Sequence, residues 1–432
     1  MRRPCAVVFN YAGRHRYGLN VLMGALESVP QVASDLFVAW EFDELTQHIS
    51  DALGGYDKVL VLWSFYSPEF WEACNSLSKV KESGSALDDP RIVHLCGGVH
   101  ATGDPQRTLR AGFDRISVGE GERRIVEIAT KLSNGDDIRT LALGRLDDGK
   151  YISAGFTEPI DLNSYPPFAP AHKRFNPIEI TRGCIYACRF CQTPFMFKAS
   201  HFRHRSVEEI CRYAQMMKQE GKRDIRFITP NALSYGSNDK SVNMDEIERL
   251  LREVRLAIGP DAGLFFGTFP SEFRPEHVTP RVLRIMKRYV TNDNVIIGAQ
   301  SGSERMLAES HRGHSLAPIF QAVRYCLDEG FVPKVDLIFG LPGEHEDELE
   351  ASVLLAERLI RQKAEVNAHT FMPLPGTPWR NAEPGKLPPR IVNELDVLAK
   401  SGRLRGDWKQ QIAIAADLHA RSKSAISEAK SR

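Results

Sequence analysis

The sequence predicts an α/β protein made of two parallel-sheet domains and a small helical extension at the C-terminus. Three observations lead to this fold class. Short apolar runs alternate with amphipathic stretches of helical spacing along most of the chain. A proline-rich segment at residues 163–177, "NSYPPFAPAHKRFNP", interrupts this alternation. Finally, the length of 432 residues is too great for one ordinary hydrophobic core.

The first 140 residues predict a doubly wound, Rossmann-like domain. Five candidate strands are separated by helical patterns, and they lie at residues 5–10, 36–40, 58–63, 91–95 and 115–118. Strands that alternate with helices in this way form a parallel sheet. Ligands bind such sheets at the carboxyl ends of the strands, so we expect a binding site at that edge.

Residues 141–176 predict a linker, and residues 177–385 predict a partial (β/α)6 barrel. The candidate barrel strands are residues 177–181, 224–229, 263–268, 294–300, 334–339 and 366–372. The chemistry of such barrels lies on the loops that follow the strands. Residues 386–432 predict a helical C-terminal extension.

Composition argues against several classes of protein. The chain is 42% hydrophobic and 26% charged, and its net charge of +1 gives no electrostatic reason to expect a nucleic-acid partner. No apolar run approaches the length of a membrane span, and the N-terminus lacks the apolar core of a secretory signal. Eight cysteines in so long a chain do not form a disulfide framework. We therefore expect a cytoplasmic protein whose clustered thiols serve metal or redox chemistry.

Three of the eight cysteines lie within residues 181–191, "TRGCIYACRFC". Cys184, Cys188 and Cys191 directly follow the first barrel strand, so three thiolates on one short loop can converge on a metal centre. Neighbouring arginines favour the deprotonated thiols. A structural zinc site would need a fourth ligand. His201 and His204 are the candidates for that ligand, so zinc stays an alternative.

The spacing C-x3-C-x2-C, with Phe190 before the last cysteine, resembles the signature of radical S-adenosylmethionine (SAM) enzymes. The resemblance implies that Cys184, Cys188 and Cys191 hold a 4Fe-4S cluster, whose fourth iron binds the amino and carboxylate groups of SAM. It also implies an electron donor such as flavodoxin or ferredoxin.

Three later segments resemble the fourth, fifth and sixth strands of the same superfamily, namely "IIGAQSGSE" (296–304), "VDLIFGLPGE" (335–344) and "HTFMPLPGTPW" (369–379). The SAM-binding residues that the resemblance implies are Phe190, Gln300, Ser301, Arg312, Ile338, Gly340, Phe371 and Met372. Arg312 would lie near the SAM carboxylate, and Ile338 near adenine. The segment "ITPNALSYG" (228–236) departs from the common Gly-Gly-Glu of the second strand, so the partners of the SAM amino group stay undefined.

Residues 91–122 resemble the end of the cobalamin-binding domain of many radical SAM proteins, in which paired glycines pass beneath the nucleotide tail. The cobalamin-binding residues that this resemblance implies are His15, Arg16, Tyr17, Gly18, Ser64, Gly97 and Gly98. Gly13 stands where the free-standing cobalamin motif has the aspartate that orients its histidine. Whether His15 binds cobalt from below therefore stays open, with Arg14, Arg16 or Tyr17 as other occupants of that space.

The function that the resemblance implies is a cobalamin-dependent radical SAM enzyme. A 5′-deoxyadenosyl radical would activate an unactivated carbon of an unidentified substrate, and methyl transfer would follow. One alternative is a methylthiotransferase with a second cluster, for which Cys5, Cys74 and Cys96 are the available thiols. The sequence is also compatible with a radical SAM cyclase or rearrangement enzyme and, more remotely, with a non-catalytic cofactor-binding sensor. No residue stands out as a general acid or base.

Overall fold

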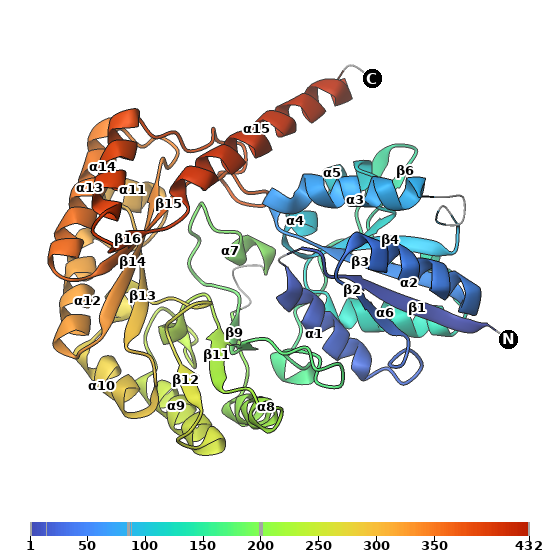
Figure 1. The fold of residues 1–432 in the computed structure, drawn as a ribbon, viewed down its shortest axis with the longest axis horizontal. Coiled ribbons are helices and arrows are strands. Elements are labelled where there is room, and N and C mark those ends of the chain that lie inside the picture. The colour runs from blue at the N-terminus through green and yellow to red at the C-terminus, as the bar shows by residue number, and fades with distance from the viewer. Residues whose placement is uncertain (1, 14, 84–86, 88, 198–201, 431–432) are drawn as a thin grey trace. The chain divides into compact units, whose positions relative to one another are not determined.

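The computed structural model describes residues 2–13, 15–83, 87, 89–197 and 202–430, without the side chains of residues 422–430. The chain forms two compact units, Met1–Asn176 and Pro177–Arg432 (Figure 1). The first unit thus includes residues 141–176, and the second includes the C-terminal extension. The finer division into four segments stays a prediction.

The first unit contains a parallel five-stranded sheet with the strand order β2-β1-β3-β4-β5. The strands are β1 (Arg3–Asn10), β2 (Leu36–Ala39), β3 (Tyr56–Ser64), β4 (Ile92–Gly97) and β5 (Arg115–Ile116). Each predicted strand is present within a few residues of its expected bounds. The order changes direction between β1 and β3, and ligands bind open α/β sheets at such switch points.

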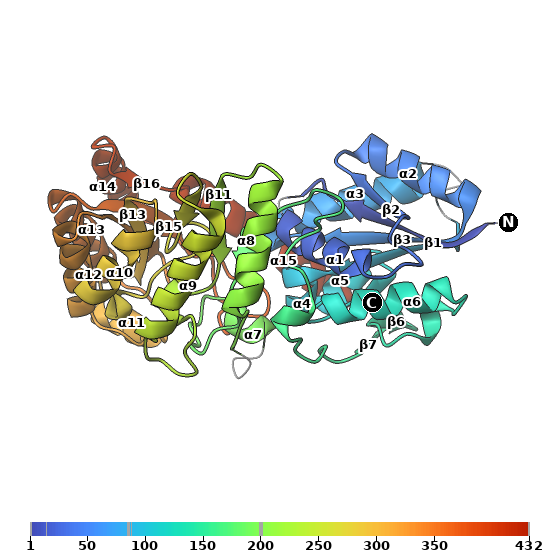
Figure 2. The same cartoon turned by 90° about the horizontal axis from the view of Figure 1, so that it is seen from below.

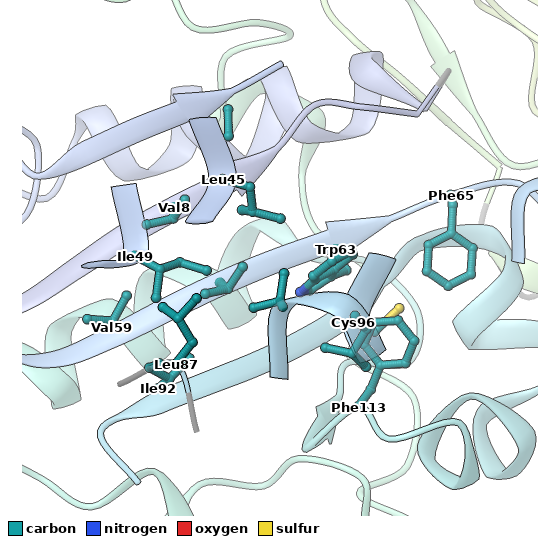
Figure 3. Packing of buried hydrophobic residues seen from close by; sticks show 14 of the residues in the cluster. Val8, Leu45, Ile49, Val59, Trp63, Phe65, Leu87, Ile92, Cys96 and Phe113 are labelled. Atoms are coloured by element: carbon teal, nitrogen blue, oxygen red, sulfur yellow. The ribbon is translucent and has the colours of Figure 1, made fainter. Parts of the chain in front are cut away.

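Helices cover both faces of this sheet, as a doubly wound fold requires. They are α1 (Arg16–Glu27), α2 (Phe42–Gly55), α3 (Phe70–Glu82), α4 (Gly98–Gly103), α5 (Pro105–Arg110) and α6 (Glu122–Ser133). Figure 2 shows α2 and α3 on one side of the strands and α6 on the other. The core under α2 and α3 includes Leu45, Ile49, Trp63, Phe65 and Phe113 (Figure 3). A second core packs α1 and α6 against the opposite face. A hairpin of β6 (Arg145–Asp147) and β7 (Lys150–Ile152) follows within the predicted linker.

The second unit is an open barrel of parallel strands. Its strands are β8 (Ile178–Glu179), β9 (Thr181–Arg182), β10 (Arg203–His204), β11 (Asp224–Ile228), β12 (Gly263–Phe265), β13 (Asn294–Gln300), β14 (Val332–Phe339), β15 (Glu365–Thr370) and β16 (Leu404–Arg405). Seven of these strands form the parallel sheets β12-β11-β8 and β13-β14-β15-β16, whereas β9 and β10 pair with each other in a separate antiparallel sheet. The bridge Phe273↔Ile297 and the Ile296 N–H donating to the Gly267 carbonyl at 2.8 Å join the region after β12 to β13. The predicted α/β class, with a doubly wound sheet and a partial barrel, is confirmed.

Alternating burial along β14 separates the two sides of the barrel wall. Val335, Leu337 and Phe339 are buried, whereas Asp336 and Ile338 between them are partly exposed. The helices are α7 (Thr193–Met196), α8 (Val207–Gln219), α9 (Met244–Ile258), α10 (Pro280–Tyr289), α11 (Glu304–Glu309), α12 (Leu316–Asp328), α13 (Glu346–Arg361), α14 (Pro389–Ala399) and α15 (Trp408–Lys430). None of the helices in the described ranges is long and apolar enough to cross a membrane.

Two details differ from the predicted elements. The first barrel strand is broken after Glu179, because Thr181 and Arg182 pair with β10 in an antiparallel ladder. The C-terminal extension is not wholly helical, since β16 pairs in parallel with β15. The backbone of the extension therefore continues the barrel sheet by one short strand.

Candidate functional site

The cysteine loop of the second unit follows β9, at the carboxyl edge of the barrel strands. Cys188 is buried, and Cys184 and Cys191 are partly buried. The Cys191 N–H donates to the Cys188 carbonyl at 3.1 Å, which tightens the end of the loop into a turn. The Cys188 thiol donates to the His311 carbonyl at 3.8 Å. The loop is thus attached to the segment that follows α11.

Burial disfavours the thiolate forms of Cys184 and Cys191, so these two thiols need a neighbouring positive charge before they ionise. Burial raises the pKa of Cys184, and burial raises the pKa of Cys191 to about 12. A bound metal supplies that charge, because a coordinating thiol is deprotonated outright. Three thiols on one loop, with no fourth cysteine beside them among the described residues, fit a cluster that keeps one iron open to a ligand.

The mononuclear zinc alternative loses support. Nδ1 of His204 lies 2.9 Å from the Thr181 hydroxyl, and its Nε2 lies 2.7 Å from the Ser237 carbonyl, so both ring nitrogens are already engaged. His201 lies outside the described residues. Within the described ranges, no three His, Cys, Asp or Glu side chains converge as the ligands of a single ion would.

Arg312 joins the cysteine loop to the barrel wall. It is only 4% exposed, its Nη1 donates to Cys188 Sγ at 3.7 Å, and its Nε donates to the Gly298 carbonyl at 3.2 Å. Glu272 Oε1 lies 3.6 Å from its Nη2. Burial opposes the charged form, but the neighbouring Cys188 and Glu272 outweigh it and raise the pKa of Arg312. A permanent buried cation therefore stands beside the cluster loop.

Gly298 makes room for these groups. A β-carbon there would lie 2.5 Å from Arg312 Nη2, 2.7 Å from Gln300 Nε2 and 2.9 Å from Glu272 Oε1. Any side chain at this position of β13 would displace the cation, the amide or the carboxylate. Three polar groups are consequently gathered over one residue that has no side chain.

A small apolar cluster adjoins the cysteine loop. It consists of buried Met306, Leu341 and Phe371, against which Phe190, Ile338, Trp379 and Ala382 pack. Three of the residues for which a SAM contact is predicted, Phe190, Ile338 and Phe371, thus meet although they come from three distant segments. Flat apolar surfaces of this kind suit an adenine ring. Met372 is partly exposed and does not belong to this cluster.

The other residues with a predicted SAM contact occupy turns after β13 and β14. Gln300 is buried and has φ +78°, a strained conformation for a residue with a side chain. Ser301 is fully buried, and its hydroxyl accepts a hydrogen bond from the Ser303 N–H at 3.1 Å. Gly340 has φ +74°, and its N–H donates to Glu344 at 2.7 Å. Their contacts with SAM stay predictions.

Two carboxylates of this site carry no sequence motif that we recognised. Glu272 lies beside Arg312, and burial raises its pKa. Asp336 accepts a hydrogen bond from Asn367 Nδ2 at 2.8 Å, and burial raises its pKa to about 6. Repulsion between Glu272 and Asp336 adds to the pKa shift of Glu272. Together they place two carboxylates near Arg312, whereas "ITPNALSYG" contains no acidic residue.

A network of buried side chains also supports the cysteine loop. The Arg274 guanidinium lies 3.5 Å from the centre of the Tyr186 ring and donates to the Arg312 carbonyl. The Tyr186 hydroxyl lies 3.0 Å from His277 Nε2, and Asn231 Nδ2 donates to His277 Nδ1 at 3.0 Å. This buried network ties the middle of the loop to the segment that carries Arg312.

In the first unit, four of the predicted cobalamin residues meet at the switch point of the sheet. His15 Nδ1 lies 2.6 Å from the Ser64 hydroxyl, which joins the loop after β1 to the end of β3. A β-carbon on Gly98 would lie 2.4 Å from Ser64 Oγ, and one on Gly18 would lie 2.6 Å from His15 Cε1. Gly98 also has φ +82°, which L side chains rarely adopt. Burial lowers the pKa of His15 to about 4, so the imidazole is neutral.

The remaining predicted cobalamin residues lie around this point. Gly97 ends β4, and a β-carbon there would meet nothing closer than 3.7 Å. Tyr17 is exposed, as is Tyr66, whose ring meets His15 edge-on at 4.8 Å between centroids. Arg16 is held by carbonyls of its own loop. A neutral imidazole, glycines and exposed aromatic rings fit a large, flat, mostly apolar ligand.

Cys5, Cys74 and Cys96 do not form a second thiol cluster in the first unit. Cys5 lies near the start of β1, in the core under α1 and α6. Cys74 in α3 and Cys96 at the end of β4 belong to the core on the opposite face of the sheet. Burial raises the pKa of each thiol, as expected of cysteines that serve as small core residues.

Comparison with known proteins gives the class of the second unit. The sequence model of the family described as "Radical SAM superfamily" matches residues 178–356. This range includes the cysteine loop, Arg312 and most of the barrel strands. This part of the chain is a radical SAM domain, and radical SAM chemistry implies a 4Fe-4S cluster and SAM. No sequence model of a cobalamin-binding family matched the chain.

Several curated proteins resemble the chain at low identity. An uncharacterized protein of Methanopyrus kandleri is 22% identical over 69% of this chain. The threonylcarbamoyladenosine tRNA methylthiotransferase of Mus musculus is 24% identical over 72%, and the tRNA-2-methylthio-N(6)-dimethylallyladenosine synthase of Moorella thermoacetica is 29% identical over 50%. The aligned regions cover 64%, 50% and 47% of these relatives, so the chain spans about half to two thirds of their length.

Two solved structures share the fold of most of the chain. The radical SAM methyltransferase TsrM from Kitasatospora setae, with a tryptophan substrate and a SAM analogue bound, has a TM-score of 0.67 at 17% identity. The match covers 88% of this chain and 76% of TsrM. The cobalamin-dependent SAM radical enzyme OxsB, with aqua-cobalamin and SAM bound, has a TM-score of 0.64 at 14% identity. That match covers 92% of this chain and 56% of OxsB. At these identities the likeness is one of fold.

Proposed function

We propose that this protein is a cobalamin-dependent radical SAM enzyme that transfers a methyl group to an unactivated carbon of its substrate. One observation carries the proposal: His15, Gly18, Ser64 and Gly98 meet at the switch point of a doubly wound sheet, in a chain that also holds a radical SAM domain. The fold shared with OxsB, an enzyme solved with both aqua-cobalamin and SAM, supports it.

The residues of the second unit have defined tasks under this proposal. Cys184, Cys188 and Cys191 would hold the 4Fe-4S cluster, and Arg312 would pair with the SAM carboxylate next to Cys188. Glu272, beside that arginine, would face the SAM ammonium group. The apolar cluster would hold adenine and exclude water from the reacting end. The bound cofactors would supply reductive SAM cleavage and a transferable methyl group, while the protein positions them.

Methylthiolation is the second candidate, because several relatives in sequence are named tRNA methylthiotransferases. Its second cluster would need three convergent thiols in the first unit. Cys5 and Cys96 lie in cores on opposite faces of the sheet, which argues against that arrangement. A net charge of +1 also offers no basic footprint for tRNA.

The deciding experiment is anaerobic reconstitution with iron, sulfide and hydroxocobalamin, followed by removal of unbound cofactor. We expect about four irons per chain, a bound corrinoid spectrum, and SAM-dependent formation of 5′-deoxyadenosine under a chemical reductant. About eight irons and no corrinoid would favour methylthiolation and overturn the proposal. Mass spectrometry of products formed from methyl-labelled SAM would then separate methyl transfer from cyclisation or rearrangement.

A further inference from the structure

Two arginines flank an exposed tryptophan at the carboxyl edge of the first unit's sheet. Trp40 directly follows β2 and is 37% exposed. The Arg16 guanidinium carbon lies 4.8 Å from the Trp40 ring centroid, and that of Arg174 lies 5.0 Å from it. The two cations come from segments more than 150 residues apart and share one indole ring.

Neither guanidinium is paired with an acid among the described residues. The Arg16 Nε donates to the carbonyls of Tyr11 and Gly13, at 3.3 and 3.2 Å, and its terminal nitrogens make no further hydrogen bond there. The Nε of Arg174 is buried and has no hydrogen-bond partner in this part of the chain. A guanidinium without an acidic partner keeps terminal nitrogens that can form charge-assisted hydrogen bonds with a bound anion.

The helix that Arg16 opens adds positive potential at the same place. α1 has twelve residues, its N-cap His15 makes no side-chain capping bond, and its first turn contains no acidic residue. The N-terminus of a helix carries free N–H groups and a partial positive charge. Natural helices commonly offset this charge with an acid, whereas here two cations stand beside it.

The geometry points to a binding site for a phosphate-ester anion made by Arg16, Arg174 and Trp40. The planar guanidinium fork matches phosphate oxygens in pairs, and the indole gives an apolar surface beside them. Arg16 is the neighbour of His15, and His15 contacts Ser64 at the proposed corrinoid site. The expected source of the anion is therefore the phosphodiester in the nucleotide loop of cobalamin. This assignment rests on the proposed function, and a phosphorylated substrate is the second source that the same chemistry would accept.

The test compares cobalamin with cobinamide, which has the same corrin ring but lacks the nucleotide loop and its phosphodiester. Binding is measured by visible-absorbance titration of the anaerobically reconstituted full chain. Arg16→Gln/Arg174→Gln is the test variant. Arg110→Gln, at an exposed position on α5 of the same unit, is the control. Circular dichroism and thermal unfolding of each variant establish that it is folded.

We expect the double variant to bind cobalamin at least tenfold more weakly than the unaltered protein and to bind cobinamide equally well. The control should bind both as before. Equal weakening of both corrinoids would overturn the inference, since the arginines would then be structural. Unchanged binding of both cobalamin and cobinamide by the double variant would rule out cobalamin as the source of the bound anion.

Equilibrium dialysis of the same proteins with labelled inorganic phosphate forms the second arm. Phosphate binding that is lost only in the double variant, with unchanged corrinoid binding, would assign the site to a phosphorylated substrate instead. No phosphate binding and no effect on cobalamin would overturn the anion site altogether. If the unaltered protein binds neither corrinoid, the proposed function fails by itself, and the phosphate arm still tests the anion site.

Discussion

The two units both place their candidate residues at the carboxyl edge of a parallel sheet, but they do so with opposite chemistry. At the centre of the second unit's site, Arg312 stands between Cys188 and Glu272, so charges and ionisable thiols are packed together. At the switch point of the first unit, a neutral imidazole meets a hydroxyl over Gly98. The first arrangement would offer a ligand charge, and the second would offer it shape and space. Substitutions should therefore have different effects in the two units.

The largest effect is expected from the cluster thiols. Cys184→Ala should abolish 5′-deoxyadenosine formation and most of the bound iron, because under the proposed function three thiolates would hold the cluster. Iron and sulfide analysis of the reconstituted protein checks this. Cys211→Ala, on α8, serves as the control and should retain about four irons. Four irons that survive Cys184→Ala would refute the assignment.

The next effect tests whether the second unit depends on its buried charge. Arg312→Met leaves Glu272 and Cys188 without their cation and should destabilise the cofactor-free protein by about 3 to 5 kcal/mol. It should also abolish SAM binding in calorimetric titration. Urea unfolding measures the stability. Adding Glu272→Gln should recover part of the loss, and no recovery would mean that the two groups are not coupled.

Arg361→Met provides the matched control for that experiment. Arg361 forms an exposed pair with Glu357 one helical turn away, in which the arginine side chain is 75% exposed. Its loss should cost at most about 0.5 kcal/mol. A similar cost for both arginines would remove the distinction between the buried and exposed pairs.

A third effect concerns the neutral imidazoles of the first unit. Burial lowers the pKa of His94 to about 4, and its Nδ1 accepts a hydrogen bond from Trp63 Nε1 at 3.1 Å. The unfolded histidine titrates near pH 6.5, so the unfolded chain binds more protons between pH 6.5 and 4. Stability should therefore fall as the pH drops through this window, by at most about 3 kcal/mol. His94→Gln should lose less unfolding free energy between pH 7 and pH 4.5 than the unaltered protein, as measured by urea unfolding at both pH values. Equal losses in the two proteins would contradict the neutral state of His94 in the folded chain.

The smallest effect tests whether the first unit depends on space. Gly98→Ala places a β-carbon 2.4 Å from Ser64 Oγ at a residue with φ +82° and should cost about 1 to 2 kcal/mol. Corrinoid binding should weaken, while the iron content stays unchanged. The control is Gly54→Ala, at an exposed glycine in α2 whose β-carbon would meet nothing within 4 Å. The control should be neutral or slightly stabilising. Corrinoid binding that is unaffected by Gly98→Ala would contradict a corrinoid site that needs the free space at Gly98.

The sequence predicts best the elements that rest on strong local patterns. β1, β3 and β4 are runs of Val, Leu and Ile bounded by turn residues, and their bounds agree with the predicted ones within about two residues. α4 and β16 were not predicted, for a physical reason. α4 has six residues and begins with a positive-φ glycine, and β16 has two residues, so neither offers a periodicity to read.

The candidate sites follow the same rule. The thiol spacing could be recognised because all three residues lie on one loop. Glu272 could not, because its segment "PSEFRPE" carries no local signal and its partner Arg312 is forty residues away. The pairing of Arg174 with Trp40 is more remote still. Such contacts are set by tertiary packing, which a single sequence does not display.

The short strand β16 covers an edge of the barrel sheet that could otherwise pair with another molecule. Without it, β15 would present the unpaired backbone groups of Val366 and Asn367 at the end of the sheet β13-β14-β15. Open edges of this kind are templates for pairing with another molecule and hence for aggregation. The two residues of β16 cover that edge. They are held there because Gly406 packs against the Ala368 backbone and the Thr370 hydroxyl donates to the Trp408 carbonyl at 3.0 Å. A version of the protein cut at residue 386 would keep every candidate cofactor residue and yet be expected to precipitate.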